Sequence, residues 1–214
     1  VNDLLMKGAR PLYLSLGLII EEGFTVTRLD RILDSIATTC SHAGVSVVTG
    51  DTKVVGKGQA DGLYINTSGI GEILPSVSVS GSNARPGDNI IVSGSIGRHG
   101  IAVMAERNGL NLRTPVSSDA GPLNDSVIPL LTSFAESVHV LRDPTRGGIA
   151  AALTEIATAS GITVTIDETA VPVDNQVAAV CELLGFDPLH LPCEGRFVAF
   201  VEHAAADDII SFLS

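Results

Sequence analysis

The chain has 214 residues, of which 45% are hydrophobic, and its 13 basic and 24 acidic residues give a formal net charge of −11. This length can hold one large or two modest domains, and the apolar content is sufficient for their cores, which argues against disorder. The acidic balance argues against nucleic acid as a partner, because phosphate backbones are bound mainly by Lys and Arg. No stretch approaches the roughly 18 apolar residues that a membrane-spanning helix needs, so no membrane role is expected.

The first part of the chain predicts a strand, a helix and two further strands. A continuous apolar run at 12–20 predicts the first strand, and apolar residues recur at helical spacing between 29 and 40. Thr27 is the expected N-cap of that helix, and Gly44 lies where a glycine stop is expected. Residues 45–49 and 62–71 predict the other two strands.

A stretch rich in Ser, Gly and Pro at 72–87 predicts a boundary between two domains, 1–80 and 81–214. The second part predicts strands at 88–94, 138–141, 162–166 and 197–201. It also predicts helices after Gly100 and at 125–136, 148–160, 175–184 and 206–213. Helices and strands alternate, but their spacing is too uneven for a doubly wound sheet, so the expected class is α+β in two halves.

The three cysteines and the first residue give two further expectations. Cys40, Cys181 and Cys193 are widely spaced without a CxxC pair, which argues against disulfides or zinc and favours a reducing, cytoplasmic setting. The chain begins with Val1, in a segment that resembles the middle of a helix. We therefore expect the sequence to be a fragment of a longer protein.

The first candidate site is the sequence Gly50-Asp51-Thr52-Lys53, which follows an apolar run. A glycine backbone, a carboxylate for Mg²⁺, a hydroxyl and a lysine are the groups that a polyphosphate needs. Gly, Asp and Thr also form turns, so a turn that ends the strand is equally compatible with this pattern. The P-loop pattern GxxxxGK[ST] is absent.

A second candidate site begins at Asp143 and continues through Pro144 and Thr145 to Gly147 and Gly148. Pro is favoured at the first position of a helix, and Asp or Thr before it caps free N–H groups, so this stretch predicts a helix start. A helix that starts with two glycines also leaves N–H groups open to a phosphate. The structural and the functional interpretation can therefore both hold.

Two further carboxylates are candidates. Asp3 lies at the start of a predicted buried helix, where it would cap the helix, pair with a cation or bind a metal, and capping is the favoured interpretation. Glu194 lies beside a predicted strand, where burial would suit a general base, although a simple turn explains the adjacent Gly195 and Arg196 could neutralise the charge. Cys193 is expected to be structural.

Taken in order, these motifs resemble the HypE family of hydrogenase maturation factors. That family belongs to the ATP-binding superfamily of aminoimidazole ribonucleotide synthetase, selenophosphate synthetase and thiamine monophosphate kinase. GDTKVV followed by RDPTRGG is specific to the HypE branch, whereas ND followed by GA is shared more widely. The resemblance rests on the segments 2–4, 8–15, 50–55, 66–71, 94–100, 142–148 and 193–196.

The resemblance implies a PurM-like α+β fold, with an N-terminal ATP-binding domain whose sheet forms a barrel in a homodimer and a C-terminal α/β sandwich. It implies an enzyme, a carbamoyl dehydratase that uses ATP to convert a carbamoylated C-terminal cysteine into a thiocyanate. That product supplies the cyanide ligands of NiFe hydrogenase. This sequence lacks the cysteine tail, so the fragment alone is expected to be inactive.

The resemblance also implies roles for particular residues. Asp3, Asp51 and Asp143 would hold Mg²⁺ and ATP, and Lys53 would act on the phosphates as a point charge. Glu194 would be the base or would orient the amide, while other donors would come from Thr52, Gly147 and Gly148. The implied partners are the carbamoyltransferase HypF and the HypC–HypD complex.

Three alternatives remain at this point. The chain could be a related selenophosphate synthetase or small-molecule kinase, a non-catalytic docking module for maturation proteins, or an unrelated α+β binding domain.

Overall fold

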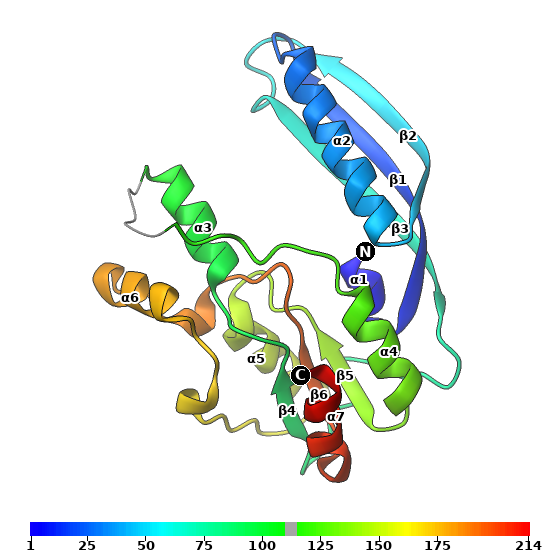
Figure 1. Ribbon diagram of the computed structural model, residues 1–214, viewed down its shortest axis with the longest axis vertical. Coiled ribbons are helices and arrows are strands. Elements are labelled where there is room, and N and C mark those ends of the chain that lie inside the picture. Colours follow the sequence, from blue (N-terminus) through cyan, green and yellow to red (C-terminus); the bar gives the residue numbers. More distant parts are fainter. Residues whose placement is uncertain (110–114) are drawn as a thin grey trace.

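The computed structural model describes residues 1–109 and 115–214. Within this part of the chain there are two sheets of three strands each, and each sheet is accompanied by helices (Figure 1). The first sheet has the order β2-β1-β3, and the second has the order β4-β6-β5. The mixture of helices and sheets confirms the expected α+β class.

The first sheet is built around a long central strand. It consists of β1 (Ala9–Glu21), β2 (Ser46–Val55) and β3 (Leu63–Ile73). β1 pairs with β2 in parallel and with β3 antiparallel. A parallel pair needs a crossover, which α2 (Val26–His42) provides while lying along one face of the sheet (Figure 1).

Two local expectations in this half were wrong. α2 begins one residue after Thr25 rather than at Thr27, because Thr25 has an extended backbone and its carbonyl oxygen accepts from the N–H of Arg28 and Leu29, at 3.1 Å each. β2 also does not end at Thr49, and Gly50 does not form the turn that was one alternative there. The strand continues through the GDTK sequence, where Asp51 pairs with Gly17 of β1. The long β1 provides a partner for these turn-forming residues, and β2 is exposed at nearly every position, so polar side chains are tolerated.

The second sheet is antiparallel around a fully buried central strand. It consists of β4 (Asn89–Val92), β5 (Val138–Arg142) and β6 (Val198–Val201), with β6 in the middle. Alternate residues of β6 enter two different apolar clusters, one containing Val201 and the other Phe200. Both faces of this sheet are therefore covered.

Helices provide those two covers (Figure 1). The cluster around Val201 includes residues of α1 (Asn2–Leu5), α4 (Asn124–Phe134) and α7 (Ala206–Leu213). The cluster around Phe200 includes residues of α5 (Gly148–Ser160). The remaining helical segments are α3 (Arg98–Arg107), α6 (Asn175–Leu184) and the 3₁₀ turns η1 (Glu168–Ala170), η2 (Pro188–His190) and η3 (His203–Ala205).

The strand expected at 162–166 was also wrong. Residues 162–167 are not part of a β-ladder, although Ile162 and Val164 pack partly buried against α5. Apolar alternation predicts which side chains are buried, but a strand also needs a hydrogen-bonded neighbour, and this segment has none in the described part of the chain.

The beginning of the chain contacts both sheets, with Leu4 beside Gly69 of β3, but its fully buried residues pack on the second sheet. Leu5 and Met6 are buried in the cluster around Val201, together with Leu74 from the end of β3. Asp3 does not cap α1, since Val1 occupies the N-cap position and no side chain bonds there. The packing of α1 thus carries Asp3 to the second half of the molecule. Among the described residues, no helix is long and apolar enough to cross a membrane.

Candidate active site

Asn2 joins three segments that are distant in the sequence. Its side-chain nitrogen donates to the carbonyl oxygens of Gly121 at 3.0 Å and Glu194 at 3.2 Å, and its side-chain oxygen accepts from the N–H of Leu123 at 3.1 Å. Asp3, the next residue, is thereby held near Glu194. The packing of α1 explains why an otherwise ordinary Asn-Asp pair lies at this position.

Asp3 and Asp143 line one cavity of about 280 Å³. Asp143 follows directly after β5 and is 7% exposed. Burial raises the pKa of its carboxyl group, and the charge of Asp3 raises it further, while a backbone hydrogen bond and Arg142 oppose the increase. Arg142 lies 3.8 Å from Asp143 but also donates to Glu155 at 2.9 Å, so its charge is shared. Two carboxylates beside one cavity form a setting that favours a bound cation.

Glu194 belongs to the same electrostatic environment. Burial raises the pKa of its carboxyl group, and the charges of Asp143, Asp119 and Asp3 raise it as well, whereas His99 lowers it. A carboxylate with a raised pKa is a stronger proton acceptor than an ordinary one, which suits a general base. Of the expected acidic residues, the structure thus brings Asp3, Asp143 and Glu194 together.

The neighbours of Glu194 have structural tasks. Arg196 donates to the carbonyl oxygens of Ser95 at 3.1 Å and Gly195 at 2.8 Å, so its guanidinium braces the backbone. Cys193 is fully buried, its sulfur accepts from the N–H of Gly97 at 3.3 Å, and burial raises the pKa of the thiol to about 11. A protonated, buried thiol is a poor nucleophile, in agreement with the structural role expected for Cys193.

Gly147 and Gly148 form the start of α5, and both have left-handed backbones with φ of 73° and 64°. The N–H of Gly148 donates to the carbonyl oxygen of Thr145 at 3.2 Å. A Cβ on Gly148 would lie 2.7 Å from the carbonyl oxygen of Leu191. These glycines therefore allow close backbone packing, and since the turn already uses the N–H of Gly148, its role as a phosphate donor stays a prediction.

Asp51, Thr52 and Lys53 lie elsewhere on the chain, on the exposed strand β2. The N–H of Thr52 donates to the Oδ1 atom of Asp51 at 2.8 Å, and both residues line a depression over β1 and β2. Asp51 does not share the cavity of Asp3 and Asp143. Among the described residues, no group of three or more His, Cys, Asp or Glu could hold a metal ion.

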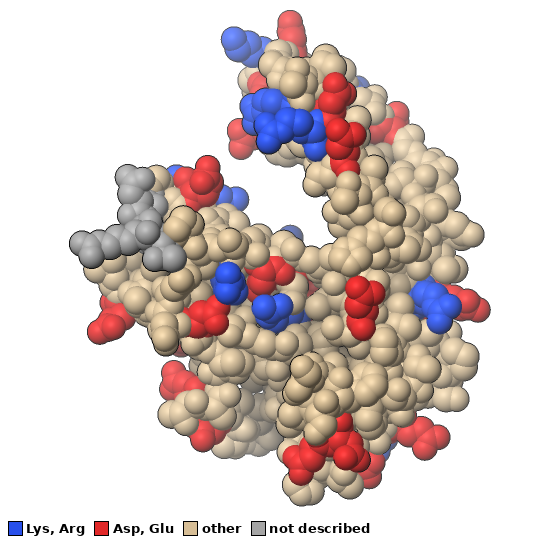
Figure 2. Space-filling view, viewed as in Figure 1, with Lys and Arg blue, Asp and Glu red and all other residues tan. Residues whose placement is uncertain are grey.

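A hollow separates the lobe formed by the first sheet and α2 from the lobe that carries α3. In the space-filling view, acidic and basic side chains gather below this hollow (Figure 2). The gathering of opposite charges there suits a polar, charged ligand better than an apolar one.

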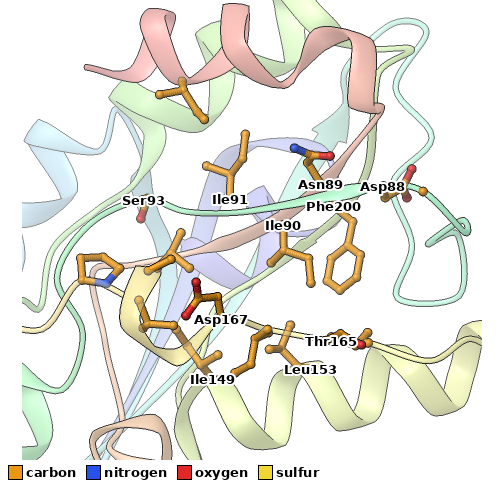
Figure 3. Close-up of a pocket in the computed structure, with 18 of the residues that line it drawn as sticks. Asp88, Asn89, Ile90, Ile91, Ser93, Ile149, Leu153, Thr165, Asp167 and Phe200 are labelled. Carbon is orange, nitrogen blue, oxygen red and sulfur yellow. The ribbon is translucent and has the colours of Figure 1, made fainter.

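A larger cavity lies elsewhere. It has a volume of about 670 Å³ and lies beside β4, between the second sheet, α5 and the segment 162–167 (Figure 3). Its walls include the apolar side chains of Ile90, Ile149, Leu153 and Phe200. None of the predicted site residues lines it, so it is not the candidate active site.

Sequence reasoning missed Asn2, His99 and Asp119. His99 Nδ1 lies 2.9 Å from the Oγ atom of Ser118, and the Oδ1 atom of Asp119 accepts from the N–H of Glu194 at 3.1 Å. Asn2 could have been predicted as a site residue, because it directly precedes the predicted Asp3 in the sequence. Asp119 had none, because its partner is 75 residues away.

Comparison with known families agrees with this arrangement. The model of the AIR synthase related protein, N-terminal domain, matches residues 1–73, and that of the C-terminal domain matches residues 85–214. The chain belongs to the AIR synthase related protein family. Together the two matches cover both sheets and every candidate site residue, which confirms the expected PurM-like fold.

Within the AIR synthase related family, the chain is similar to proteins named carbamoyl dehydratase HypE. It is 46% identical over 211 residues to that of Cupriavidus necator and 40% identical over 214 residues to that of Escherichia coli K12. These matches cover 99% of this chain but 60% and 62% of the relatives. The chain thus spans about three fifths of the length of the curated relatives it matches.

The similar solved structures also include HypE proteins. A crystal structure of hydrogenase maturation protein HypE in complex with ATP has a TM-score of 0.96 and 47% identity, covering 99% of this chain and 63% of that one. A HypE–HypF complex has a TM-score of 0.95 and 47% identity, covering 97% and 68%. A thiamine monophosphate kinase from Aquifex aeolicus has a TM-score of 0.73 at 19% identity, covering 95% and 70%, a likeness that shows the fold alone.

Proposed function

We propose that the full-length protein is an ATP-dependent carbamoyl dehydratase that converts the carbamoylated thiol of its own C-terminal cysteine into a thiocyanate. The observation that carries the proposal is that Asp3 and Asp143 line one cavity and that both charges act on Glu194, in a chain 40–47% identical to proteins of that name. A kinase is less favoured, since the similar thiamine monophosphate kinase structures are only 19–22% identical to this chain.

The chemistry follows from the substrate. The oxygen of a carbamoyl group is a poor leaving group, and transfer of the γ-phosphoryl group of ATP to it allows departure as phosphate. The carbon–oxygen bond then breaks while both N–H protons are removed, which leaves a carbon–nitrogen triple bond, ADP and phosphate. Glu194 is the proposed base, because its raised pKa suits proton removal and it is exposed to the site.

The proposed nucleotide and metal contacts come from both halves of the chain. Mg²⁺ is commonly held by one or two carboxylates together with substrate phosphates, so Asp3 and Asp143 fit this role, and the ion would neutralise phosphate charge. Asp51, Thr52 and Lys53 are proposed as further contacts to Mg²⁺ and ATP. Because Asp51 lies apart from the other two in one chain, its participation needs a second copy or closure of the two lobes.

We propose a homodimer formed through the first sheet. Large apolar side chains are exposed on all three of its strands, among them Val48 and Val54 on β2 and Ile70 on β3, at 60%, 66% and 68% exposure. Apolar surface of this kind is typically buried by a partner. Sedimentation of the double variant Val48→Glu/Ile70→Glu should show monomers, while Val26→Glu, on α2 and 70% exposed, should leave the dimer intact. A dimer in both variants would refute this interface.

Further proposals concern setting and partners. HypF is the proposed carbamoyl donor and the HypC–HypD complex the proposed acceptor of cyanide, consistent with the HypE–HypF complex found for a relative. Three free cysteines are compatible with the proposed cytoplasmic location. We also retain the domain limits 1–80 and 81–214 as a proposal, with α1 packed across that boundary.

The dehydration is tested on the full-length chain after carbamoylation of its terminal cysteine. Addition of Mg²⁺ and ATP should remove one water from the protein, measured by intact mass, and release one phosphate. Glu194→Gln should bind ATP but lose the dehydration rate, and Asp143→Asn should lose ATP binding itself. ATP hydrolysis without loss of water from the carbamoylated chain would contradict the proposed activity.

A further inference from the structure

A short segment, residues 117–121, contacts three of the residues around the candidate site. The carbonyl oxygen of Ser117 accepts from Arg98 Nε at 3.2 Å, and the Oγ atom of Ser118 lies 2.9 Å from His99 Nδ1. The carbonyl oxygen of Gly121 accepts from the side chain of Asn2 at 3.0 Å. We call residues 117–121 the bracing segment, because its contacts reach α1 and the start of α3 at once.

Asp119, at the centre of the bracing segment, contacts the backbone of the proposed base. Its Oδ1 atom accepts from the N–H of Glu194 at 3.1 Å. Within residues 1–109 and 115–214, its Oδ2 atom is buried without a hydrogen-bond partner. A buried carboxylate oxygen without a protein partner costs free energy, which the hydrogen bond at Oδ1 offsets only in part.

Gly195 shows how closely the backbone at 194–195 packs against the bracing segment. A Cβ on Gly195 would overlap the carbonyl oxygen of Asp119, and it would lie 2.9 Å from the carbonyl carbon of that residue and 3.3 Å from the nitrogen of Gly121. Only a residue without a side chain allows this approach. The backbone that carries Glu194 is therefore fixed by a hydrogen bond on one side and by direct packing on the other.

We propose that Asp119 is a positioning residue that holds the backbone of Glu194 so that the Glu194 carboxylate faces the reacting carbamoyl group. The inference rests on the proposed dehydratase function, in which Glu194 is the base. Asp119 acts through the Glu194 N–H and does not touch the substrate. Because Ser118 contacts His99, the bracing segment also sets the distance between His99 and the base.

The size of the expected effect follows from geometry. A hydrogen bond from an N–H to a carboxylate is stronger and shorter than one between neutral groups, so its loss frees the segment at 194–195 to shift. A displacement of about 1 Å at a reacting group can lower a rate by about 100-fold. The ATP contacts proposed for Asp3 and Asp143 do not pass through this hydrogen bond, so ATP affinity should stay near that of the wild type.

The test uses the full-length chain and three variants. Asp119→Ala removes the acceptor, whereas Asp119→Asn removes the charge but keeps an oxygen in the Oδ1 position. Asp167→Ala is the matched control, because the Oδ1 atom of Asp167 also accepts from a backbone N–H, that of Thr169 at 3.0 Å, outside the site. The measurements are the single-turnover rate of dehydration, the ATP affinity by calorimetry, and hydrogen exchange of the Glu194 amide.

We expect Asp119→Ala to slow dehydration by about 100-fold with ATP affinity changed by less than about twofold, and to speed exchange of the Glu194 amide. Asp119→Asn should recover most of the rate and of the amide protection, and Asp167→Ala should match the wild type. A wild-type rate in Asp119→Ala would overturn the proposal, and so would an Asn variant as slow as the Ala variant.

The Asn variant and the amide measurement keep the test decisive if Asp119→Ala does not fold. In that case, a folded Asn variant with a slow rate and an exposed Glu194 amide overturns the proposal, and one with a near wild-type rate and a protected amide supports it. If the wild-type chain itself shows no dehydration, the proposed function fails. The amide exchange then still reports whether Asp119 holds Glu194.

Discussion

The backbone of Gly148 meets the backbone of Leu191 so closely that a Cβ on Gly148 would lie 2.7 Å from the Leu191 carbonyl oxygen. Gly148 also has a left-handed backbone with φ of 64°. Gly148→Ala would add a backbone overlap to a strained conformation, and strain alone costs about 1–3 kcal/mol. We expect a loss of about 3 kcal/mol or more in the free energy of unfolding, measured by urea denaturation.

Gly161 provides the matched control for this prediction. It has nearly the same φ, 65°, but a Cβ there would meet nothing within 4 Å. Gly161→Ala should therefore cost only the conformational strain, about 1 kcal/mol. Equal losses in the two variants would mean that contact with the segment around Leu191 does not determine the need for glycine at the start of α5.

The packing of Gly148 illustrates what the sequence alone could predict. The helical spacing of apolar residues and the glycines at both ends predicted α5 at 148–160, as observed. Both signals are local in the sequence. The same local reasoning ended a strand at Thr49 and left a turn at Gly50 as one alternative, whereas the strand continues because β1 offers a ladder partner. It also predicted a strand at 162–166 that has no partner among the described residues. Both errors arise because pairing is a tertiary property.

The residues of the candidate site likewise include some with a local sequence signal and some without one. Asp3, Asp143 and Glu194 each lie in a recognisable local pattern, but only the family resemblance implied that they share a site, and the structure places them within one electrostatic environment. Asp51 was predicted as part of the same site and lies apart in one chain. Asp119 escaped prediction because one hydrogen bond across 75 residues leaves no pattern in the sequence.

A buried pair of a histidine and an aspartate gives a second prediction. His139 Nδ1 lies 2.9 Å from Asp88 Oδ2, and both side chains are 6% exposed. Asp88 also accepts from the N–H of Arg85 at 2.8 Å, so it holds the turn that precedes β4. Asp88→Ala leaves His139 Nδ1 buried without its hydrogen-bond partner and should lower the free energy of unfolding by about 1–3 kcal/mol in chemical denaturation.

The exposed pair of His42 and Asp125 is the control for the buried one. It has the same chemistry at 3.4 Å, but its side chains are 65% and 76% exposed. Asp125→Ala should change the free energy of unfolding by about 0–1 kcal/mol. A loss for Asp88→Ala as small as this would show that the buried pair contributes no more than a surface contact.

The thiols give a third prediction. Cys193 is fully buried and burial raises its pKa to about 11, so at pH near 8 almost none of it is thiolate. Iodoacetamide should therefore leave Cys193 unmodified in the native protein and label it only after unfolding, as peptide mass spectrometry would show. Cys40, which is partly exposed on α2, should react first. Rapid native labelling of Cys193 would contradict its burial.

The last prediction concerns the balance between stability and function at Asp143. Burial raises the pKa of this carboxyl group above its value in the unfolded chain. Its contribution to stability is therefore fully present below the unfolded pKa and is lost as the pH rises through the folded pKa. At neutral pH the ionised Asp143 destabilises the protein when no cation is bound.

Asp143→Asn should thus raise the melting temperature of the ligand-free protein at pH 7 by about 2–4 °C, with a smaller gain at about pH 4. The same variant should lose the additional stabilisation that Mg²⁺ and ATP give to the wild type, measured in paired thermal scans. Asp34→Asn, at an exposed position on α2, should behave like the wild type in both scans. A destabilised Asp143→Asn that still responds to Mg²⁺ and ATP would show that Asp143 serves the fold rather than the ligand.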